Sequence, residues 1–113
     1  MDLRAASNFA ILETESDHAV RLHLTGDLDI ASVPSLDERL AQARAGDLSV
    51  CLDLSELDFI DSTGLHALIR AIDDANSNGW RLQIDRAMPP QVMRLLQLVH
   101  FERLIPGYDS DAR

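Results

Sequence analysis

The chain has 113 residues, the length of one small domain with room for a hydrophobic core. Its formal net charge of −9 opposes binding to nucleic acid or insertion at an anionic membrane surface, because both are negatively charged. All ten basic residues are arginines, which excludes a P-loop lysine, a Schiff-base lysine and a lysine general base. No apolar segment approaches the roughly 20 residues that span a bilayer. The amino terminus lacks the apolar core of a secretory signal, so we expect a cytoplasmic protein.

The single cysteine, Cys51, rules out a disulfide within the chain. It lies in the apolar run Val50–Leu54 without a basic neighbour in sequence, which favours a small buried hydrophobe over a reactive thiol. The four histidines show no metal-ligand spacing. We therefore expect no metal site, no cofactor and no catalytic residue.

The first half of the chain predicts two strands and a helix. Phe9–Glu13 and Ala19–Thr25 have the composition of strands, and the second alternates cleanly between apolar and polar side chains. Gly26–Asp29 interrupts the alternation and leads toward a helix. Ser32 is predicted to cap that helix, whose apolar residues keep helical spacing until Gly46 ends it.

The second half alternates strands with helices. Leu48–Leu54 is predicted to be the central strand, because it is short, apolar and followed by an acidic turn. The next helix has its apolar residues at positions i, i+3, i+4 and i+7 and ends at Asn76–Gly79. Arg81–Asp85 predicts another strand. Pro89-Pro90 starts a third helix, and a short strand is predicted near Arg103–Ile105.

The predicted elements follow the order β-β-α-β-α-β-α-β. Strand–helix–strand units imply parallel neighbours with right-handed crossovers, whereas the first two strands are expected to pair antiparallel at an edge. We expect one α/β domain, with a mixed, mostly parallel sheet of about 4–5 strands and about 3–4 helices packed on it. The domain is expected to span residues 9–106, between a flexible amino terminus at 1–8 and a tail at 107–113.

The segment Asp61–Leu65, Asp-Ser-Thr-Gly-Leu, lies where a strand passes into the second helix. Asp61 and Ser62 are both preferred helix caps, and either side chain can accept a hydrogen bond from an unpaired backbone N–H. Gly64 falls in the first turn, where glycine costs up to about 1 kcal/mol relative to alanine. Capping does not require that glycine, whereas close approach of another protein's backbone favours it.

Three segments together resemble the STAS domain, which is found in bacterial anti-sigma factor antagonists and in sulfate transporters. They are Gly26–Ala31, Val50–Leu54 and Phe59–Leu65. The similarity extends from Phe9 to Pro106, and its Asp-Ser-Thr-Gly-Leu element is fairly specific where it joins a strand to a helix. The family more often has glutamate where this chain has Asp27, a difference that keeps the charge.

The resemblance implies a partner-switching protein. In the family, the first serine of the motif, here Ser62, is phosphorylated by an anti-sigma factor that is itself a serine kinase. The unphosphorylated antagonist binds that kinase and releases the sigma factor, and a serine phosphatase restores the active form. We thus expect a monomeric anti-sigma factor antagonist that is switched off by phosphorylation of Ser62. The expected partner-binding residues are Asp27, Asp58, Asp61, Ser62, Thr63, Gly64 and Leu65.

The roles of individual side chains stay open at this point. Asp61 can orient the hydroxyl or cap the helix, and Thr63 is either a second phosphate acceptor or an ordinary first-turn residue. Asp27 is either part of the binding surface, in a loop near the motif, or a plain turn aspartate. His66 can share a helix face with Ser62, although a plain surface histidine is the simpler interpretation.

Other functions are less consistent with the sequence. An acid protease has Asp-Ser/Thr-Gly, but one extra residue separates Asp61 from Gly64 here, and the flanking periodicity is helical. A phosphoaspartate receiver needs a lysine, and the Gly-x-Ser-x-Gly elbow of a serine hydrolase is absent. The remaining alternative is a STAS scaffold subunit of a stress-signalling complex, or a cytoplasmic STAS subunit of a transporter. In those settings Ser62 is structural or is modified by another kinase.

Overall fold

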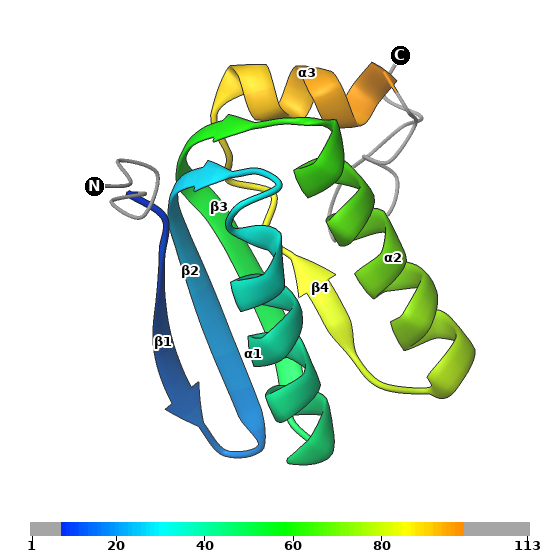
Figure 1. Cartoon of the computed structure of the whole chain (residues 1–113). Coiled ribbons are helices and arrows are strands. Elements are labelled where there is room, and N and C mark those ends of the chain that lie inside the picture. The colour runs from blue at the N-terminus through cyan, green and yellow to red at the C-terminus, as the bar shows by residue number, and fades with distance from the viewer. Residues whose placement is uncertain (1–7, 99–113) are drawn as a thin grey trace.

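Seven helices and strands make up residues 8–98, the part of the chain that this computed structural model describes (Figure 1). They are β1 (Ala10–Ser16), β2 (Ala19–Leu28), α1 (Val33–Ala45), β3 (Ser49–Ile60), α2 (Ser62–Asn78), β4 (Leu82–Ile84) and α3 (Pro90–Leu98). The strand predicted near Arg103–Ile105 lies outside the described residues. Within them, no helix is long and apolar enough to cross a membrane.

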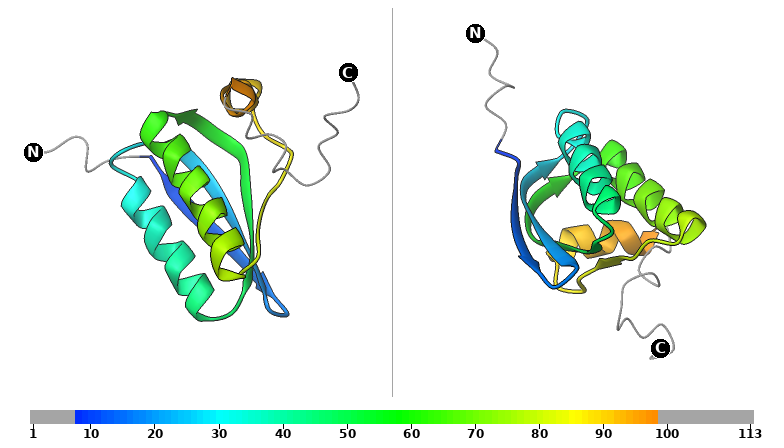
Figure 2. Two further views of the ribbon diagram at one scale, coloured as in Figure 1. Left: turned by 90° about the vertical axis from the view of Figure 1, so that its right-hand side faces the viewer. Right: turned by 90° about the horizontal axis from the view of Figure 1, so that it is seen from below.

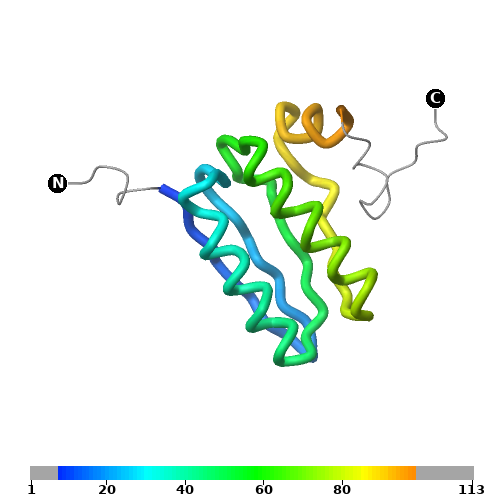
Figure 3. The backbone as a smooth tube through the Cα atoms, turned by 45° about the vertical axis from the view of Figure 1, so that its right-hand side comes forward, coloured from blue at the N-terminus to red at the C-terminus, as the bar shows by residue number. Residues whose placement is uncertain are grey.

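The four strands form one mixed sheet in the order β1-β2-β3-β4. β1 pairs antiparallel with β2, while β2, β3 and β4 are parallel neighbours, since each parallel connection passes through a helix. The predicted α/β fold, with a mostly parallel sheet and an antiparallel edge pair, is confirmed. Figure 2 shows α1 and α2 side by side on one face of the sheet. α3 lies near the end of the sheet at which β3 passes into α2 (Figure 3).

The hydrophobic core lies between the sheet and the two long helices. Alternate residues of β2 and β3 point into it, as the period-two pattern predicts. One stripe of each helix covers them at helical spacing, and each buried aliphatic side chain contributes about 1.5–3 kcal/mol. The fully buried leucines and isoleucine include Leu22, Leu24, Leu28, Leu36, Leu52, Leu54, Leu57, Leu68 and Ile84.

β3 continues to Ile60, whereas the sequence predicted a strand ending at Leu54 and an acidic turn behind it. The register between β3 and β2 shifts twice, and at each shift β3 carries one residue more than β2. Such bulges break the alternation of buried and exposed residues, so that Leu54, Leu57 and Ile60 are buried at a spacing of three. The predicted strand end was wrong because the acidic residues after Leu54 were interpreted as a turn, whereas they continue the strand through the two bulges.

β2 also extends past its predicted end at Thr25 and reaches Leu28. Gly26 has a φ of +84°, which favours glycine, and a Cβ at this position would lie 2.4 Å from the backbone oxygen of Asn8. Asp27 and Leu28, which follow Gly26, belong to the strand rather than to the predicted turn. Pairing of the two strands continues to Leu28 and Ile60, immediately before α2.

Helix α1 begins after Ser32 as predicted, but the Ser32 side chain does not cap it. Its hydroxyl donates to the carbonyl oxygen of Asp27 at 2.7 Å and accepts from the N–H of Asp29 at 2.9 Å. The Asp29 carboxylate in turn accepts from the N–H groups of Ala31 and Ser32 at 3.0 and 3.2 Å. The turn between β2 and α1 is thus held by its own side chains.

Candidate functional site

The first turn of α2 is capped by Asp61 and not by Ser62. Asp61 is extended, with φ −103° and ψ −176°, and its Oδ1 accepts a hydrogen bond from the Gly64 N–H at 2.8 Å. The Leu65 N–H donates to the Asp61 carbonyl oxygen at 2.9 Å and begins the helical pattern. The sequence offered two candidate caps, and the structure selects the aspartate.

Ser62 is the first residue of α2, and it is exposed. Its side chain makes no hydrogen bond to any residue between 8 and 98. Thr63 is half-buried, so the serine carries the more accessible of the two hydroxyls in the motif. A group attached to Ser62 would lie at the positive end of a 17-residue helix. His66, on the next turn, is exposed.

Gly64 is buried where α2 crosses the end of β2. A Cβ at this position would lie 2.3 Å from the carbonyl oxygen of Leu28 and 3.0 Å from Cγ1 of Ile60. Because any larger residue would clash here, glycine is required despite its cost of about 1 kcal/mol in a helix. The glycine is thereby explained within the chain, and it no longer indicates close approach by a partner's backbone. Leu65 is buried as well and belongs to the core.

The end of β2 lies directly beside the motif. The Asp61 N–H donates to the carbonyl oxygen of Leu28 at 3.2 Å, and Asp27 is paired with Phe59 across the two strands. Asp27 is therefore in a strand and half-buried, rather than in the expected loop. The structure thus brings Asp27 and Ser62 to the same end of the sheet, although they are far apart in the sequence.

The surface around Ser62 is acidic. Segments 27–32 and 56–66 contain five carboxylates and no arginine. The carboxylates of Asp29 and Asp61 are engaged by backbone N–H groups, and Glu56 Oε1 lies 3.2 Å from His23 Nε2. Asp27 and Asp58 have no side-chain partner among residues 8–98.

Two large apolar side chains are exposed at the same end of the sheet. Ile30 is 73% exposed and Phe59 is 50% exposed. Neither residue was predicted as a site residue from the sequence. Phe59 was missed because the predicted central strand ended at Leu54. In a strand whose last residue, Ile60, faces the core, the preceding residue points to the opposite side. That alternation was the signal that could have identified Phe59.

A separate polar cluster lies on the sheet face that the two long helices leave uncovered. Asp53 Oδ2 lies 3.2 Å from Arg21 Nη2 and 3.0 Å from His23 Nδ1. Arg21 also forms an ion pair with Asp85, and the imidazole contacts Glu56. The cluster therefore connects β2 and β3 with Asp85, the residue that follows β4. The sequence pattern gave no indication of this cluster.

The charges of this cluster stabilise one another. Burial opposes ionisation of Asp53, yet hydrogen bonds from Ser55, His23 and Arg21 hold its pKa well below the usual range. Hydrogen bonds to Glu56 and then to Asp53 raise the pKa of His23. Burial raises the pKa of the Cys51 thiol, which disfavours the reactive thiolate. No group of residues within 8–98 is arranged to hold a metal ion.

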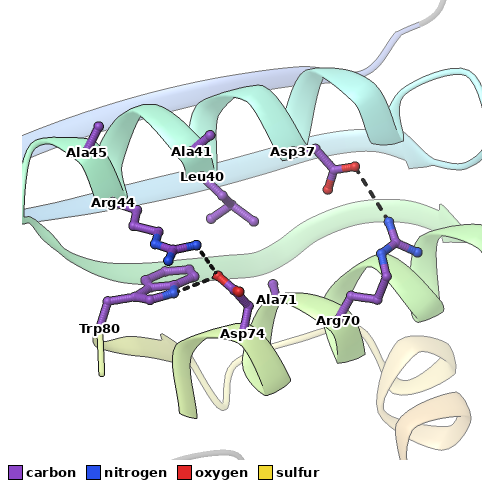
Figure 4. A pocket seen from close by; sticks show the side chains of 9 residues that line it. All are labelled: Asp37, Leu40, Ala41, Arg44, Ala45, Arg70, Ala71, Asp74 and Trp80. Carbon is purple, nitrogen blue, oxygen red and sulfur yellow. Dashed lines mark hydrogen bonds and ion pairs between the residues drawn. The ribbon is translucent and has the colours of Figure 1, made fainter. Parts of the chain in front are cut away.

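A groove of about 540 Å³ separates α1 from α2 (Figure 4). Arg44 Nη1 lies 2.7 Å from Asp74 Oδ2, which also accepts from Trp80 Nε1 at 2.9 Å. Toward the other end, Arg70 Nη2 lies 3.5 Å from Asp37 Oδ2. Ala41 and Ala71 lie between these pairs, and their small side chains leave the space open (Figure 4). The two ion pairs link the helices, and the described residues that line the groove present no unpaired charged group to a ligand.

Comparison with known proteins identifies the family of this chain. The family profile described as "Mlab, STAS domain" matches residues 11–106. A curated relative, the anti-sigma-B factor antagonist of Staphylococcus aureus strain NCTC 8325 / PS 47, is 27% identical over 99 residues, which cover 87% of this chain and 91% of the relative.

Solved structures share the fold. An anti-sigma factor antagonist from Mycobacterium paratuberculosis superimposes with a TM-score of 0.76 at 20% identity, covering 92% of this chain and 88% of that one. The Bacillus cell fate determinant SpoIIAA in its phosphorylated form gives a TM-score of 0.68 at 16% identity, covering 90% and 94%. At these identities the structures establish the fold alone, while the family profile covers most of the chain. The chain belongs to the STAS domain family.

Proposed function

We propose that this chain is an anti-sigma factor antagonist, acting in the cytoplasm, that binds an anti-sigma factor serine kinase and is switched off by phosphorylation of Ser62. The observation that carries the proposal is the Ser62 hydroxyl, which is exposed at the start of α2 while Asp61 does the capping. A hydroxyl that makes no hydrogen bond to residues 8–98 is available to a kinase site. The name of the S. aureus relative supports the same role.

The phosphate would weaken the complex through charge and size. It adds about −1.5 to −2 charges at neutral pH. A kinase site that faces Ser62 holds nucleotide phosphates and a catalytic carboxylate, and this chain adds Asp58 and Asp61 on its own side. Like charges about 5 Å apart repel by about 3 kcal/mol at an effective dielectric constant near 20, before salt screening. A residual 1–3 kcal/mol corresponds to roughly a ten- to hundredfold loss of affinity.

The same modification leaves the fold intact. Ser62 makes no hydrogen bond to residues 8–98 that a phosphate would break, and the helix start favours negative charge. With no arginine in segments 27–32 and 56–66, no guanidinium group in those segments would pair with the phosphate and rearrange the surface. The modified monomer therefore stays folded, and a serine phosphatase returns it to the binding form.

Binding measurements on three variants test the proposal. Purified anti-sigma factor serine kinases of the source genome are titrated singly, without ATP, against Ser62→Ala, Ser62→Asp and the isosteric control Thr63→Val. Ser62→Ala is expected to bind like the wild type, and Thr63→Val, which adds no charge, is expected to bind more tightly than Ser62→Asp. Ser62→Asp is expected to bind at least tenfold more weakly, because it places a charge at the position of the phosphate.

Equal affinity of Ser62→Ala and Ser62→Asp would contradict the switch. A scaffold or transporter subunit is not expected to bind these kinases, since its function does not require a kinase that recognises Ser62. Binding only to such an assembly, with no measurable kinase complex, would favour that alternative.

A further inference from the structure

We infer that Ile30 and Phe59 are the apolar anchors of the surface around Ser62, and that they enter an apolar pocket of the partner kinase that is ringed by arginine or lysine side chains. This inference rests on the proposed function, and it adds the residues and the partner chemistry that determine recognition.

The two side chains flank the end of the sheet that leads to Ser62. Leu28 and Ile60 are the last paired residues of β2 and β3. Ile30 follows the first of them by two residues, Phe59 precedes the second by one, and Ser62 comes two residues after Ile60. Ile30 thus lies in the turn just after β2 and Phe59 near the end of β3, so that a protein covering Ser62 at this end of the sheet is placed to contact both.

Within residues 8–98, packing gives no reason for these two residues to be apolar. Neither Ile30 nor Phe59 belongs to the core cluster or to the half-buried side chains packed against it. Their neighbours Leu28 and Ile60 already supply the contacts to the core. Large apolar side chains that are exposed beside a functional group are typical of an interaction site, and buried aromatic anchors dominate the affinity of many complexes.

The charges around the anchors specify the partner's chemistry. Asp27 is the cross-strand neighbour of Phe59, and Asp58 precedes it in the chain. Both carboxylates lack a side-chain partner within residues 8–98. An apolar centre with an acidic rim is complementary to an apolar pocket with a basic rim. The basic groups would steer association, while the anchors would set the lifetime of the complex.

Alanine variants test whether these two side chains, and not any exposed apolar side chain, determine the affinity. The dissociation constant for the purified kinase, without ATP, is measured for Ile30→Ala, Phe59→Ala and the control Leu12→Ala. Leu12 is 60% exposed on β1, the edge strand. Each anchor variant is expected to weaken binding at least tenfold, and the control less than twofold. Conservative Phe59→Leu and Ile30→Val should retain most of the affinity, and urea unfolding of all variants should match the wild type.

The role of the acidic rim, Asp27 and Asp58, is tested by binding kinetics. Asp58→Asn is expected to slow association several-fold at low salt and to leave dissociation almost unchanged, because rim charges act on encounter. High salt should remove that difference.

Three results would overturn the inference, and they are distinguishable. If the wild type binds a kinase and both anchor variants bind within twofold of it, the anchors are wrong while the proposed function stands. If the wild type binds no anti-sigma factor kinase, the proposed function fails and this inference with it. A Leu12→Ala loss as large as that of Phe59→Ala would also contradict a local anchor.

Discussion

The carboxylate of Asp61 accepts a hydrogen bond from the Gly64 N–H at 2.8 Å, and this contact separates capping from switching in the motif. Asp61 caps the first turn of the helix, and the adjacent Ser62 hydroxyl makes no hydrogen bond to residues 8–98. A phosphate on Ser62 can therefore alter a binding surface without removing the helix cap.

Replacing Asp61 should lower stability through the lost cap. Asp61→Ala is expected to reduce the free energy of unfolding by about 1 kcal/mol, the usual effect of losing an aspartate cap, while Asp61→Asn should retain most of it. Urea unfolding followed by circular dichroism measures both. Ser62→Ala serves as the control and should differ from the wild type by less than about 0.5 kcal/mol. A larger effect of Ser62→Ala would mean that the serine is the working cap.

Gly64→Ala should destabilise the protein even though alanine is the better helix former. The added Cβ would lie 2.3 Å from the carbonyl oxygen of Leu28, and overpacking of this kind costs about 1–3 kcal/mol. Gly46→Ala is the matched control, because its Cβ would lie in ordinary contact, 3.6 Å from the backbone oxygens of Gln42 and Ala43. Unfolding in urea should show a loss for the first variant and little change for the second. A stabilised Gly64→Ala protein would contradict the packing of α2 on β2.

The His23 cluster predicts a pH dependence of stability. Glu56 and Asp53 raise the pKa of His23 above its ordinary value of 6.5, so the folded state favours the protonated imidazole. Its contribution is complete below pH 6.5 and is lost as the pH rises through the folded-state pKa. Urea unfolding between about pH 5.5 and 8.5 should therefore show a decline in the wild type that is smaller in His23→Gln. Parallel profiles for the two proteins would rule out this contribution.

Much of the fold follows from periodicity alone. The helical stripe that includes Leu65, Leu68 and Ile72 predicted α2, and the clean alternation around Leu22 predicted a half-buried strand. The motif also located Ser62 at a strand-to-helix junction. These features are local, so the sequence pattern contains the information that they need.

Other features depend on contacts that no local pattern reports. The bulges in β3 change which side chains are buried beyond Leu54, and they concealed both the length of the strand and the exposure of Phe59. The need for Gly64 arises from Leu28, a residue distant in sequence that lies against the helix. The choice of Asp61 over Ser62 as the cap is a matter of side-chain geometry, since both residue types cap helices well.

The most direct test of the switch is the dissociation constant of the kinase complex before and after the chain is fully phosphorylated by that kinase. The wild type is incubated with the kinase and ATP, the phosphate is mapped by tandem mass spectrometry, and the repurified protein is titrated without ATP. We predict one phosphate on Ser62 and binding roughly ten- to hundredfold weaker than that of the unmodified protein. A phosphate on Thr63 alone, or an unchanged dissociation constant with Ser62 fully phosphorylated, would contradict the proposed switch.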